Sequence, residues 1–301
     1  MAQRDWGRDV GIVHPGAMGA RVAAQAVAAG ATVRWVSEGR SAATRERAAE
    51  AGLRAVGSLA ELAATSQVLL SVCPPAAAGE VARRVAATGF SGVYADANAV
   101  SPQLMAEIVA AFRGGTATVV DGGITGPPPR RAGTTRLYLS GDTEAVARVA
   151  ALFAGTLLTP VALAGPVGRA SALKLAFAAY NKISYALAAH ACALAEGHGV
   201  LDELLDLAAH QLPGTPLAEP DVLAGAGPRA WRWEPEMREI ARAWREAGLP
   251  GSFAEAAAET FDRWSAHKDD PTVTGARLIA DLAGKAAEGP RPPEADTDDQ
   301  G

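Results

Sequence analysis

The turn from His14 to Gly19 has the residue types that bind a phosphate group through backbone atoms. A buried run from Val10 to Val13 leads into the turn, and Arg21 to Ala29 continues as a helix. The first N–H groups of such a helix can donate to a pyrophosphate, and glycine leaves it room to approach. The expected contacts are His14, Pro15, Gly16, Ala17, Met18 and Gly19. The turn predicts a dinucleotide site, although His14 replaces the first glycine of the G-x-G-x-x-G pattern and a purely structural turn is the alternative.

The segment from Ser37 to Ser41 follows a second strand and is expected beside the adenosine ribose of the dinucleotide. An acidic residue there accepts hydrogen bonds from the free 2′-hydroxyl of NAD, whereas arginine and hydroxyl groups suit the 2′-phosphate of NADP. Ser37, Arg40 and Ser41 favour NADP, and Glu38 favours NAD. Because Glu38 comes one residue after the usual position of the acid, we predict NADP, with NAD as the alternative.

Short β-branched runs that alternate with alanine-rich helical segments must position these turns. The expected strands are Val10–Val13, Thr32–Val36, Leu53–Val56, Val68–Val72, Gly92–Asp96, Thr118–Asp121 and Arg136–Ser140. Helical segments such as Ala20–Ala29, Ala42–Ala51 and Thr143–Phe153 lie between or after them. This rhythm is typical of an α/β Rossmann domain with a doubly wound parallel sheet, which we assign to residues 1–163.

The remainder of the chain is rich in helix formers. From Gly168 they run almost unbroken to Glu196, enough for a helix of about eight turns. Further helical segments follow on either side of a Pro- and Gly-rich stretch, residues 212–228, without any β-rich run. We predict an all-α domain over residues 164–286. Residues 287–301 are acidic and Pro-rich, so a disordered tail is expected there.

The composition excludes several classes of protein. The 301 residues include 49% hydrophobic and 20% charged side chains, and a formal net charge of −5 leaves no broad basic face for nucleic acid or membrane. No apolar run approaches the roughly 20 residues of a spanning helix. The N-terminus does not read as a secretion signal, and the two distant cysteines suit a reducing compartment, so a cytoplasmic protein is expected. The histidines lack paired metal-ligand spacing, so no metal is expected.

Five motifs occur in order along the chain: VGIVHPGAMG, LLSVCPP, YADANAVSP, VVDGGITGPPP and GPVGRASALK. Together, over roughly residues 8 to 200, they resemble the β-hydroxyacid dehydrogenase family, whose members include 3-hydroxyisobutyrate and 6-phosphogluconate dehydrogenases. The later motif GPRAWRWEPEMREIA resembles a branch with a divergent C-terminal helical domain. The resemblance implies cofactor contacts at Cys73 and Pro74, and at Asn98 near the nicotinamide ribose or the substrate.

The resemblance also places a substrate anchor at Thr125 and Gly126. The hydroxyl of Thr125 and the backbone N–H of Gly126 can donate to a substrate carboxylate. The next residue, Pro127, replaces a glycine of the family motif and has no N–H to offer. One donor is therefore lost, and a rigid loop without a binding role is the alternative.

The essential lysine of the family corresponds to Lys174, which lies in a largely apolar segment. Partial burial makes an ammonium group easier to deprotonate, as an acid/base catalyst requires. The family usually has an asparagine one turn later, where this chain has Ala178. Asn181 is a candidate substitute in substrate binding, because it is seven residues after Lys174 and so lies on the same helix face.

These residues favour an NADP-preferring oxidoreductase that acts on a small hydroxy acid, with Lys174 as the general acid/base. The resemblance further implies a homodimer that buries the long helix. Two alternatives stay open, which are an NADPH-dependent imine reductase and a dinucleotide-binding regulatory protein without catalysis. In the C-terminal domain, Trp231, Trp233 and Met237 are expected to pack in the core, or else to form an apolar wall over the substrate.

Overall fold

The computed structural model describes residues 7–283, which divide into two compact units. The first unit comprises the described residues up to Ala178 together with Arg242–Leu249, and the second comprises Ala179–Ala241 and the described residues from Pro250 onward. The division falls within the long helix α7 (Arg169–Gly197). The predicted domain limit at residue 163 stays a prediction, and the predicted tail, residues 287–301, lies outside the described residues.

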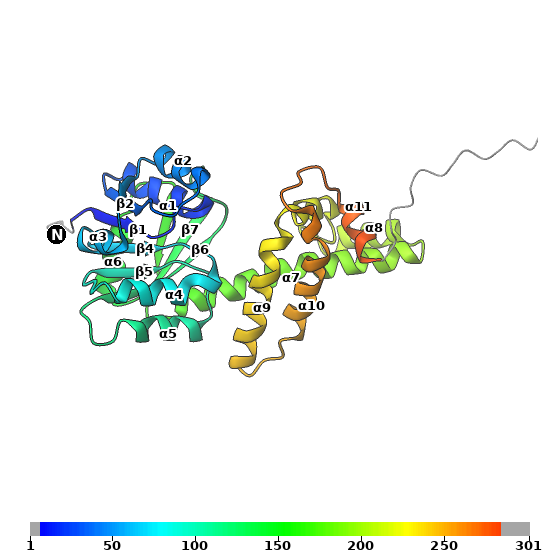
Figure 1. Ribbon diagram of the computed structural model, residues 1–301. Coiled ribbons are helices and arrows are strands. Elements are labelled where there is room, and N and C mark those ends of the chain that lie inside the picture. The colour runs from blue at the N-terminus through cyan, green and yellow to red at the C-terminus, as the bar shows by residue number, and fades with distance from the viewer. Residues whose placement is uncertain (1–6, 284–301) are drawn as a thin grey trace, which may run out of the picture. The chain divides into compact units, whose positions relative to one another are not determined.

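The first unit is built on an eight-stranded sheet in the order β3-β2-β1-β4-β5-β6-β7-β8 (Figure 1). The strands are β1 (Asp9–Ile12), β2 (Thr32–Val36), β3 (Arg54–Val56), β4 (Val68–Ser71), β5 (Val93–Asp96), β6 (Thr118–Thr125), β7 (Thr135–Gly141) and β8 (Leu158–Ala162). All neighbours pair in parallel except β6 and β7. The strand order reverses between β1 and β4, which is where such sheets bind ligands. The predicted Rossmann fold is confirmed.

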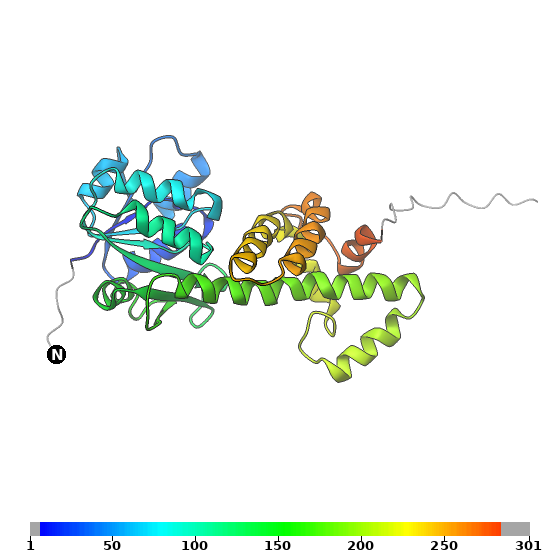
Figure 2. The ribbon, with the colours of Figure 1, turned by 90° about the horizontal axis from the view of Figure 1, so that it is seen from below.

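Helices cover both faces of this sheet: α1 (Ala17–Ala28), α2 (Ala42–Glu50), α3 (Leu59–Ala64), α4 (Pro75–Ala86), α5 (Pro102–Ala111) and α6 (Thr143–Ala151). Alternate residues of β4 enter two separate cores, Val68 and Leu70 on one face and Leu69 on the other. The first core includes residues of α1 and α6, and the second includes residues of α3, α4 and α5. In both views, α4 and α5 lie side by side (Figure 1 and Figure 2).

Two features of the sheet differ from the sequence-based prediction. Strand β6 continues four residues beyond Asp121 to Thr125, where it pairs with β7 in the antiparallel direction. The strand β8 was not predicted, because Pro160 in its middle is a poor indicator of a strand. Here Pro160 is tolerated because β8 is an edge strand that pairs with β7 alone.

Every regular element of the second unit is helical in the described residues, which confirms the predicted all-α region. Besides part of α7 they are α8 (Leu201–Gln211), η1 (Pro220–Gly225), η2 (Gly227–Arg229), α9 (Ala230–Glu246), α10 (Ser252–Arg263), η3 (Ser265–His267) and α11 (Gly275–Leu282), with the end of α9 in the first unit. The ring of Trp233 lies 5.6 Å from Tyr185 and 5.3 Å from Phe261. Met237 is fully buried, whereas Trp231 is 39% exposed, so core packing describes Met237 and much of Trp233.

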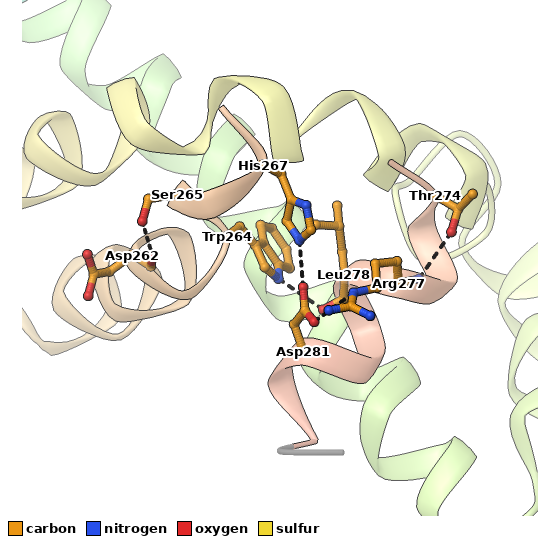
Figure 3. A network of polar contacts seen from close by, with 8 residues as sticks. All are labelled: Asp262, Trp264, Ser265, His267, Thr274, Arg277, Leu278 and Asp281. Atoms are coloured by element: carbon orange, nitrogen blue, oxygen red, sulfur yellow. Dashed lines mark hydrogen bonds and ion pairs between the residues drawn. The ribbon is translucent and has the colours of Figure 1, made fainter. Parts of the chain in front are cut away.

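A polar network fixes α11 to the end of α10 and to η3 (Figure 3). His267 Nε2 lies 2.7 Å from Asp281 Oδ2, and Arg277 Nε lies 3.0 Å from Asp281 Oδ1. The indole N–H of the buried Trp264 donates to the carbonyl oxygen of Leu278 at 2.9 Å. These contacts link segments up to 14 residues apart in sequence and account for His267 as a structural residue.

Candidate functional site

The turn after β1 has two glycines with different structural roles. A Cβ atom on Gly19 would lie 2.3 Å from the carbonyl oxygen of His14, so the fold itself requires this glycine. A Cβ atom on Gly16 would meet only His14 Cδ2, at an ordinary 3.6 Å. Gly16 is the N-cap of α1, where no side chain caps the helix and no acidic residue lies in the first turn. The space beside Gly16 and the first N–H groups of α1 therefore fit a phosphate group.

The side chain of His14 is bound to Arg40 from the turn after β2. Arg40 Nη1 lies 2.8 Å from His14 Nδ1, and Nη2 donates to the carbonyl oxygen of Val13 at 3.4 Å. Burial lowers the pKa of His14, and the positive charges of Arg40 and Arg47 lower it further. The imidazole is consequently neutral at pH 7, so its Nδ1 can accept a hydrogen bond.

The turn from Ser37 to Ser41 presents one cationic group, Arg40, to this corner of the sheet. Ser41 caps α2, because its hydroxyl accepts from the backbone N–H of Thr44 at 3.3 Å. Arg45 Nε donates to the carbonyl oxygen of Arg40 at 3.2 Å. Glu38 is exposed to solvent. The structure therefore brings Arg40 against the turn at His14, while it occupies the hydroxyl of Ser41 in a helix cap.

Asn98 joins the ends of β4 and β5. Its Oδ1 accepts from the backbone N–H of Cys73 at 2.6 Å, and its Nδ2 donates to Ser71 Oγ at 3.1 Å and to Asp96 Oδ2 at 2.9 Å. The side-chain N–H groups of Asn98 thus already have partners within the protein. Pro74 begins the next helix as the N-cap of α4. Asn98 fixes the loop of Cys73 and Pro74, and its predicted direct contact with a cofactor or substrate stays a prediction.

The carboxyl group that holds Asn98, Asp96, was missed by the sequence analysis. It is fully buried at the end of β5. Burial raises its pKa to about 7, even though hydrogen bonds from Asn98 lower it. Burial also raises the pKa of the Cys73 thiol to about 11, so this cysteine is a poor nucleophile near pH 7. An acid directly after a buried strand, as in YADAN, was the signal available in the sequence.

A second buried carboxyl group, Asp121 of β6, caps the start of α7. Its Oδ2 accepts from the backbone N–H groups of Gly168, Ala170 and Ser171 at 2.9, 2.9 and 3.0 Å. Its Oδ1 accepts from Ser171 Oγ at 2.5 Å, and Ser140 Oγ donates to Oδ2 at 2.9 Å. Local sequence does not predict this cap, because its donors are up to 50 residues away.

The cap brings Lys174 against the end of β6. A Cβ atom on Gly123 would lie 2.8 Å from the carbonyl oxygen of Ala170 and 3.0 Å from Lys174 Cβ, so only glycine lets α7 approach this closely. Lys174 is half-buried there. Thr125 is two residues after Gly123 on the same strand, so it lies on the same face of β6 as Lys174.

The loop after Thr125 depends on Gly126. This residue has a φ of +100°, and a Cβ atom there would lie 2.1 Å from the carbonyl oxygen of Thr134. Thr135 Oγ1 donates to the carbonyl oxygen of Pro127 at 2.6 Å and so ties the loop to β7. The loop is therefore tied closely to β7, which is compatible with both the anchoring role and the structural alternative.

Asn181 is in the second unit, whereas Lys174 is in the first. It is exposed and lines a cavity of about 240 Å³ together with Tyr180, Ser184, Tyr185 and Thr215. The next residue, Lys182, forms an ion pair with Glu236 and lies 5.4 Å from the centre of the Trp233 ring. The structure thus gives Asn181 a cavity, but its predicted partnership with Lys174 stays a prediction.

Residues 7–283 contain neither a metal-binding cluster nor a membrane-spanning helix. No group of three or more His, Cys, Asp and Glu side chains in this range could hold a metal ion. No helix in the same range is both long enough and apolar enough to cross a membrane.

Two segments of the chain match known protein families. Residues 9–156 match the family described as the NAD binding domain of 6-phosphogluconate dehydrogenase. Residues 195–264 match a domain of unknown function, DUF1932. The predicted resemblance, including the unusual C-terminal region, is confirmed. No curated protein matches the chain.

Solved structures share the fold over most of their length. A conserved hypothetical protein from Sinorhizobium meliloti is 24% identical, with a TM-score of 0.71 over 92% of this chain and 96% of that one. The 3-hydroxyisobutyrate dehydrogenase of Mycobacterium tuberculosis, with L-serine, is 19% identical, with a TM-score of 0.73 over 92% and 99%. A reductive aminase from Aspergillus terreus, in complex with NADPH and ethyl levulinate, is 20% identical, with a TM-score of 0.57 over 92% and 99%.

Proposed function

We propose that the chain is an NADP-preferring oxidoreductase, since residues 9–156 match the NAD binding domain of 6-phosphogluconate dehydrogenase. It transfers a hydride between the cofactor and a small hydroxy acid, at the carbon that is CH–OH in the reduced form and C=O in the oxidised form. The observation that carries the proposal is the common face of β6, where Gly123 admits Lys174 and Thr125 follows two residues later. A proton-transfer group and a hydroxyl donor for a carboxylate therefore adjoin one surface.

The residues beside α1 fit the pyrophosphate of a dinucleotide, because Gly16 leaves space that packing does not require. The N–H groups of the first turn of α1 would hold it. Arg40 and Ser37 would bind the 2′-phosphate of NADP, with Ser41 contributing if its hydroxyl serves both this group and the cap of α2. When bound, the nicotinamide supplies a hydride acceptor or donor.

Lys174 handles the proton of the reaction. In oxidation, its neutral amine, or a water that it orients, accepts the proton of the substrate hydroxyl; in reduction, its ammonium returns that proton to oxygen. The Thr125 hydroxyl and the Gly126 N–H donate to the substrate carboxylate and hold its carbon in place. Asp121 keeps Lys174 in position, because it fixes the first turn of α7.

A substrate panel tests this proposal. Purified protein is incubated with hydroxy acids and NADP or NAD, and in the reverse direction with keto acids and the reduced cofactors, while nicotinamide absorbance is followed. We expect turnover of a hydroxy acid with a preference for NADP. Equal or better turnover with NAD would contradict the role given to Arg40.

Imine reduction is the second candidate function. Two departures from the hydroxyacid motifs favour it, Pro127 and Ala178, and a reductive aminase with bound NADPH shares the fold. The retained Lys174 favours the hydroxy acid instead. Cyclic imines added to the same panel separate the two chemistries, since an imine reductase would reduce them and leave hydroxy acids untouched. A regulatory protein without catalysis would bind NADPH and turn over neither class.

We also propose a homodimer in the cytoplasm. On α7, Tyr180, Leu187 and Leu194 recur every seven residues and are 79%, 69% and 67% exposed. Such a repeat forms one apolar stripe along a helix, suited to packing against another helix. Sedimentation of the wild type and of Leu187→Glu tests this, with a dimer expected for the first and a monomer for the second.

A further inference from the structure

His14 is the residue of the dinucleotide turn that the family pattern does not explain. Its Nδ1 lies 2.8 Å from Arg40 Nη1. A guanidinium group has only donors, so Nδ1 must be the acceptor in this contact. A neutral imidazole that accepts at Nδ1 carries its hydrogen on Nε2. The contact with Arg40 therefore fixes the tautomer of His14.

One edge of the His14 ring borders the space beside Gly16. His14 Cδ2, the atom bonded to Nε2, lies 3.6 Å from the position of a Cβ atom on Gly16. The contact with Arg40 is the one hydrogen bond of the His14 ring to any residue in the range 7–283. The Nε2–H group is one bond away from Cδ2, the ring atom beside the N-cap residue Gly16, and it has no other partner from these residues.

Arg40 is held by a second contact, from Nη2 to the carbonyl oxygen of Val13 at 3.4 Å. Its backbone belongs to the turn after β2, which in this type of domain lies beside the adenosine ribose. His14 and Val13 together therefore orient the guanidinium of Arg40 from the neighbouring turn. One imidazole therefore joins the turn after β1 to the turn after β2.

We propose that His14 binds the cofactor through both ring nitrogens: Nε2–H donates to the pyrophosphate, and Nδ1 positions Arg40 for the 2′-phosphate. This inference rests on the proposed dinucleotide site and adds a specificity role to a residue that otherwise only replaces a glycine. Recognition of the two phosphate groups is then coupled, since one side chain serves both.

Two substitutions separate the two nitrogens. In His14→Asn, the amide oxygen can occupy the place of Nδ1, while the Nε2 donor is lost. In His14→Gln, the amide nitrogen can reach the place of Nε2, while the acceptor for Arg40 is lost. Arg40→Ala removes the guanidinium, and Arg113→Ala is the matched control, because Arg113 is an exposed arginine of the same unit that lies outside both turns. Thermal melting verifies that each variant is folded.

Calorimetric titration with four ligands reads out the two roles without turnover. NADPH and NADH differ in the 2′-phosphate, ADP-ribose has the pyrophosphate alone, and adenosine 2′,5′-bisphosphate has the 2′-phosphate without a pyrophosphate. For His14→Asn we expect affinities for NADPH, NADH and ADP-ribose to fall together by about tenfold, the value of one charge-assisted hydrogen bond. For His14→Gln we expect a loss of about tenfold for NADPH and the bisphosphate, with NADH and ADP-ribose unchanged.

The inference is overturned if folded His14→Asn and His14→Gln both bind all four ligands as the wild type does. It is equally overturned if both variants lose the same factor for all four, because His14 would then only shape the turn. A wild-type protein that binds none of the four contradicts the proposed dinucleotide site itself, and with it the role of His14. Arg113→Ala must leave all four affinities unchanged for an effect of Arg40→Ala to be specific.

Discussion

The two helices that begin at the candidate site, α1 and α7, differ at their N-termini: that of α7 is capped by a side chain, and that of α1 is not. The first turn of α7 is capped by Asp121, a buried residue that accepts hydrogen bonds from three backbone N–H groups and from the hydroxyl of Ser171. The first turn of α1 follows Gly16 and has no side-chain cap. Both ends carry the partial positive charge of a helix N-terminus. In α7 the protein neutralises that charge itself, whereas in α1 it leaves the charge available.

The two helix starts are therefore suited to different tasks. A helix start that is saturated by its own protein is rigid and unable to bind an anion, so it is suited to holding Lys174. An uncapped start with space beside it is suited to receiving an anion from outside. The comparison therefore assigns binding to α1 and chemistry to α7, and the assignment can be tested from both sides.

Lys174→Ala should impair catalysis without weakening cofactor binding. Loss of a general acid/base should lower kcat by about 10²- to 10⁴-fold. NADPH affinity should be unchanged, because the proposed cofactor contacts lie at α1 and the turn after β2. Steady-state kinetics and calorimetric titration measure the two effects separately.

The matched control is Lys268→Ala, since Lys268 is exposed and lies over the Trp231 ring at 4.2 Å. It should keep both kcat and NADPH affinity. A Lys174→Ala variant with normal turnover would remove Lys174 from the mechanism. The retained α7 cap would then need another explanation.

Asp121→Ala should remove the cap from the N-terminus of α7. Several buried N–H groups would lose their acceptor at once, so we expect a loss of about 3 kcal/mol in the free energy of unfolding. Ser58→Ala is the control, because Ser58 is a single-bond cap of α3 and its loss should cost about 1 kcal/mol. Denaturant unfolding of both variants gives the comparison. A cost for Asp121→Ala no larger than that of the control would mean that α7 does not depend on this cap.

The uncapped start of α1 could be predicted from sequence, whereas the capped start of α7 could not. The glycines of the α1 turn and the buried run before them are consecutive residues, so local spacing predicts the site. The cap of α7 joins Asp121 to Ser171 across 50 residues, and only the pairing of β6 with its neighbours brings the two together. Gly123 is similar, since its need for glycine comes from the later residues Ala170 and Lys174.

The misplaced strand limits have the same physical origin. Strand β6 extends to Thr125 because β7 pairs with it, and β8 forms around Pro160 because an edge position tolerates the missing N–H. Neither fact is local. Asn98 was predicted as a ligand contact from its motif, yet its partners Cys73, Ser71 and Asp96 became apparent only when β4 and β5 lay side by side.

The buried Asp96 makes the free energy of unfolding depend on pH. Its pKa is about 7 in the folded protein, against an ordinary value of 3.8. At pH values between these two pKa values, the folded state binds more protons than the unfolded state. The contribution of Asp96 to the free energy of unfolding therefore falls as the pH rises from about 4 to 7, and then levels off. We expect a fall of about 2 kcal/mol or more across this range, measured by unfolding at several pH values.

Asp96→Asn should flatten that part of the profile, because the amide does not titrate. Its Oδ1 can still accept from the backbone N–H of Asn98, whereas its Nδ2 would face the donor Nδ2 of Asn98. The variant should therefore be less stable than the wild type at pH 4 and closer to it at pH 7. An unchanged slope would assign the pH dependence to other groups.

Gly16→Ala directly tests whether the uncapped start of α1 binds an anion. Gly16 has a φ of −69°, which alanine adopts readily, and a Cβ atom there meets only His14 Cδ2 at 3.6 Å. Gly16→Ala should therefore leave the free energy of unfolding almost unchanged. It should nevertheless weaken NADPH binding by about tenfold, because the new methyl group occupies the approach of the pyrophosphate.

Gly19→Ala, three residues later, should show the reverse order of effects. Its Cβ atom would lie 2.3 Å from the carbonyl oxygen of His14, so the helix must shift, at a cost of about 1–3 kcal/mol in stability. Unfolding and NADPH titration on the same two variants separate a glycine kept for packing from one kept for a ligand. If Gly16→Ala bound NADPH as tightly as the wild type, the uncapped start of α1 would not be an anion site, and the contrast with α7 would reduce to a difference in capping alone.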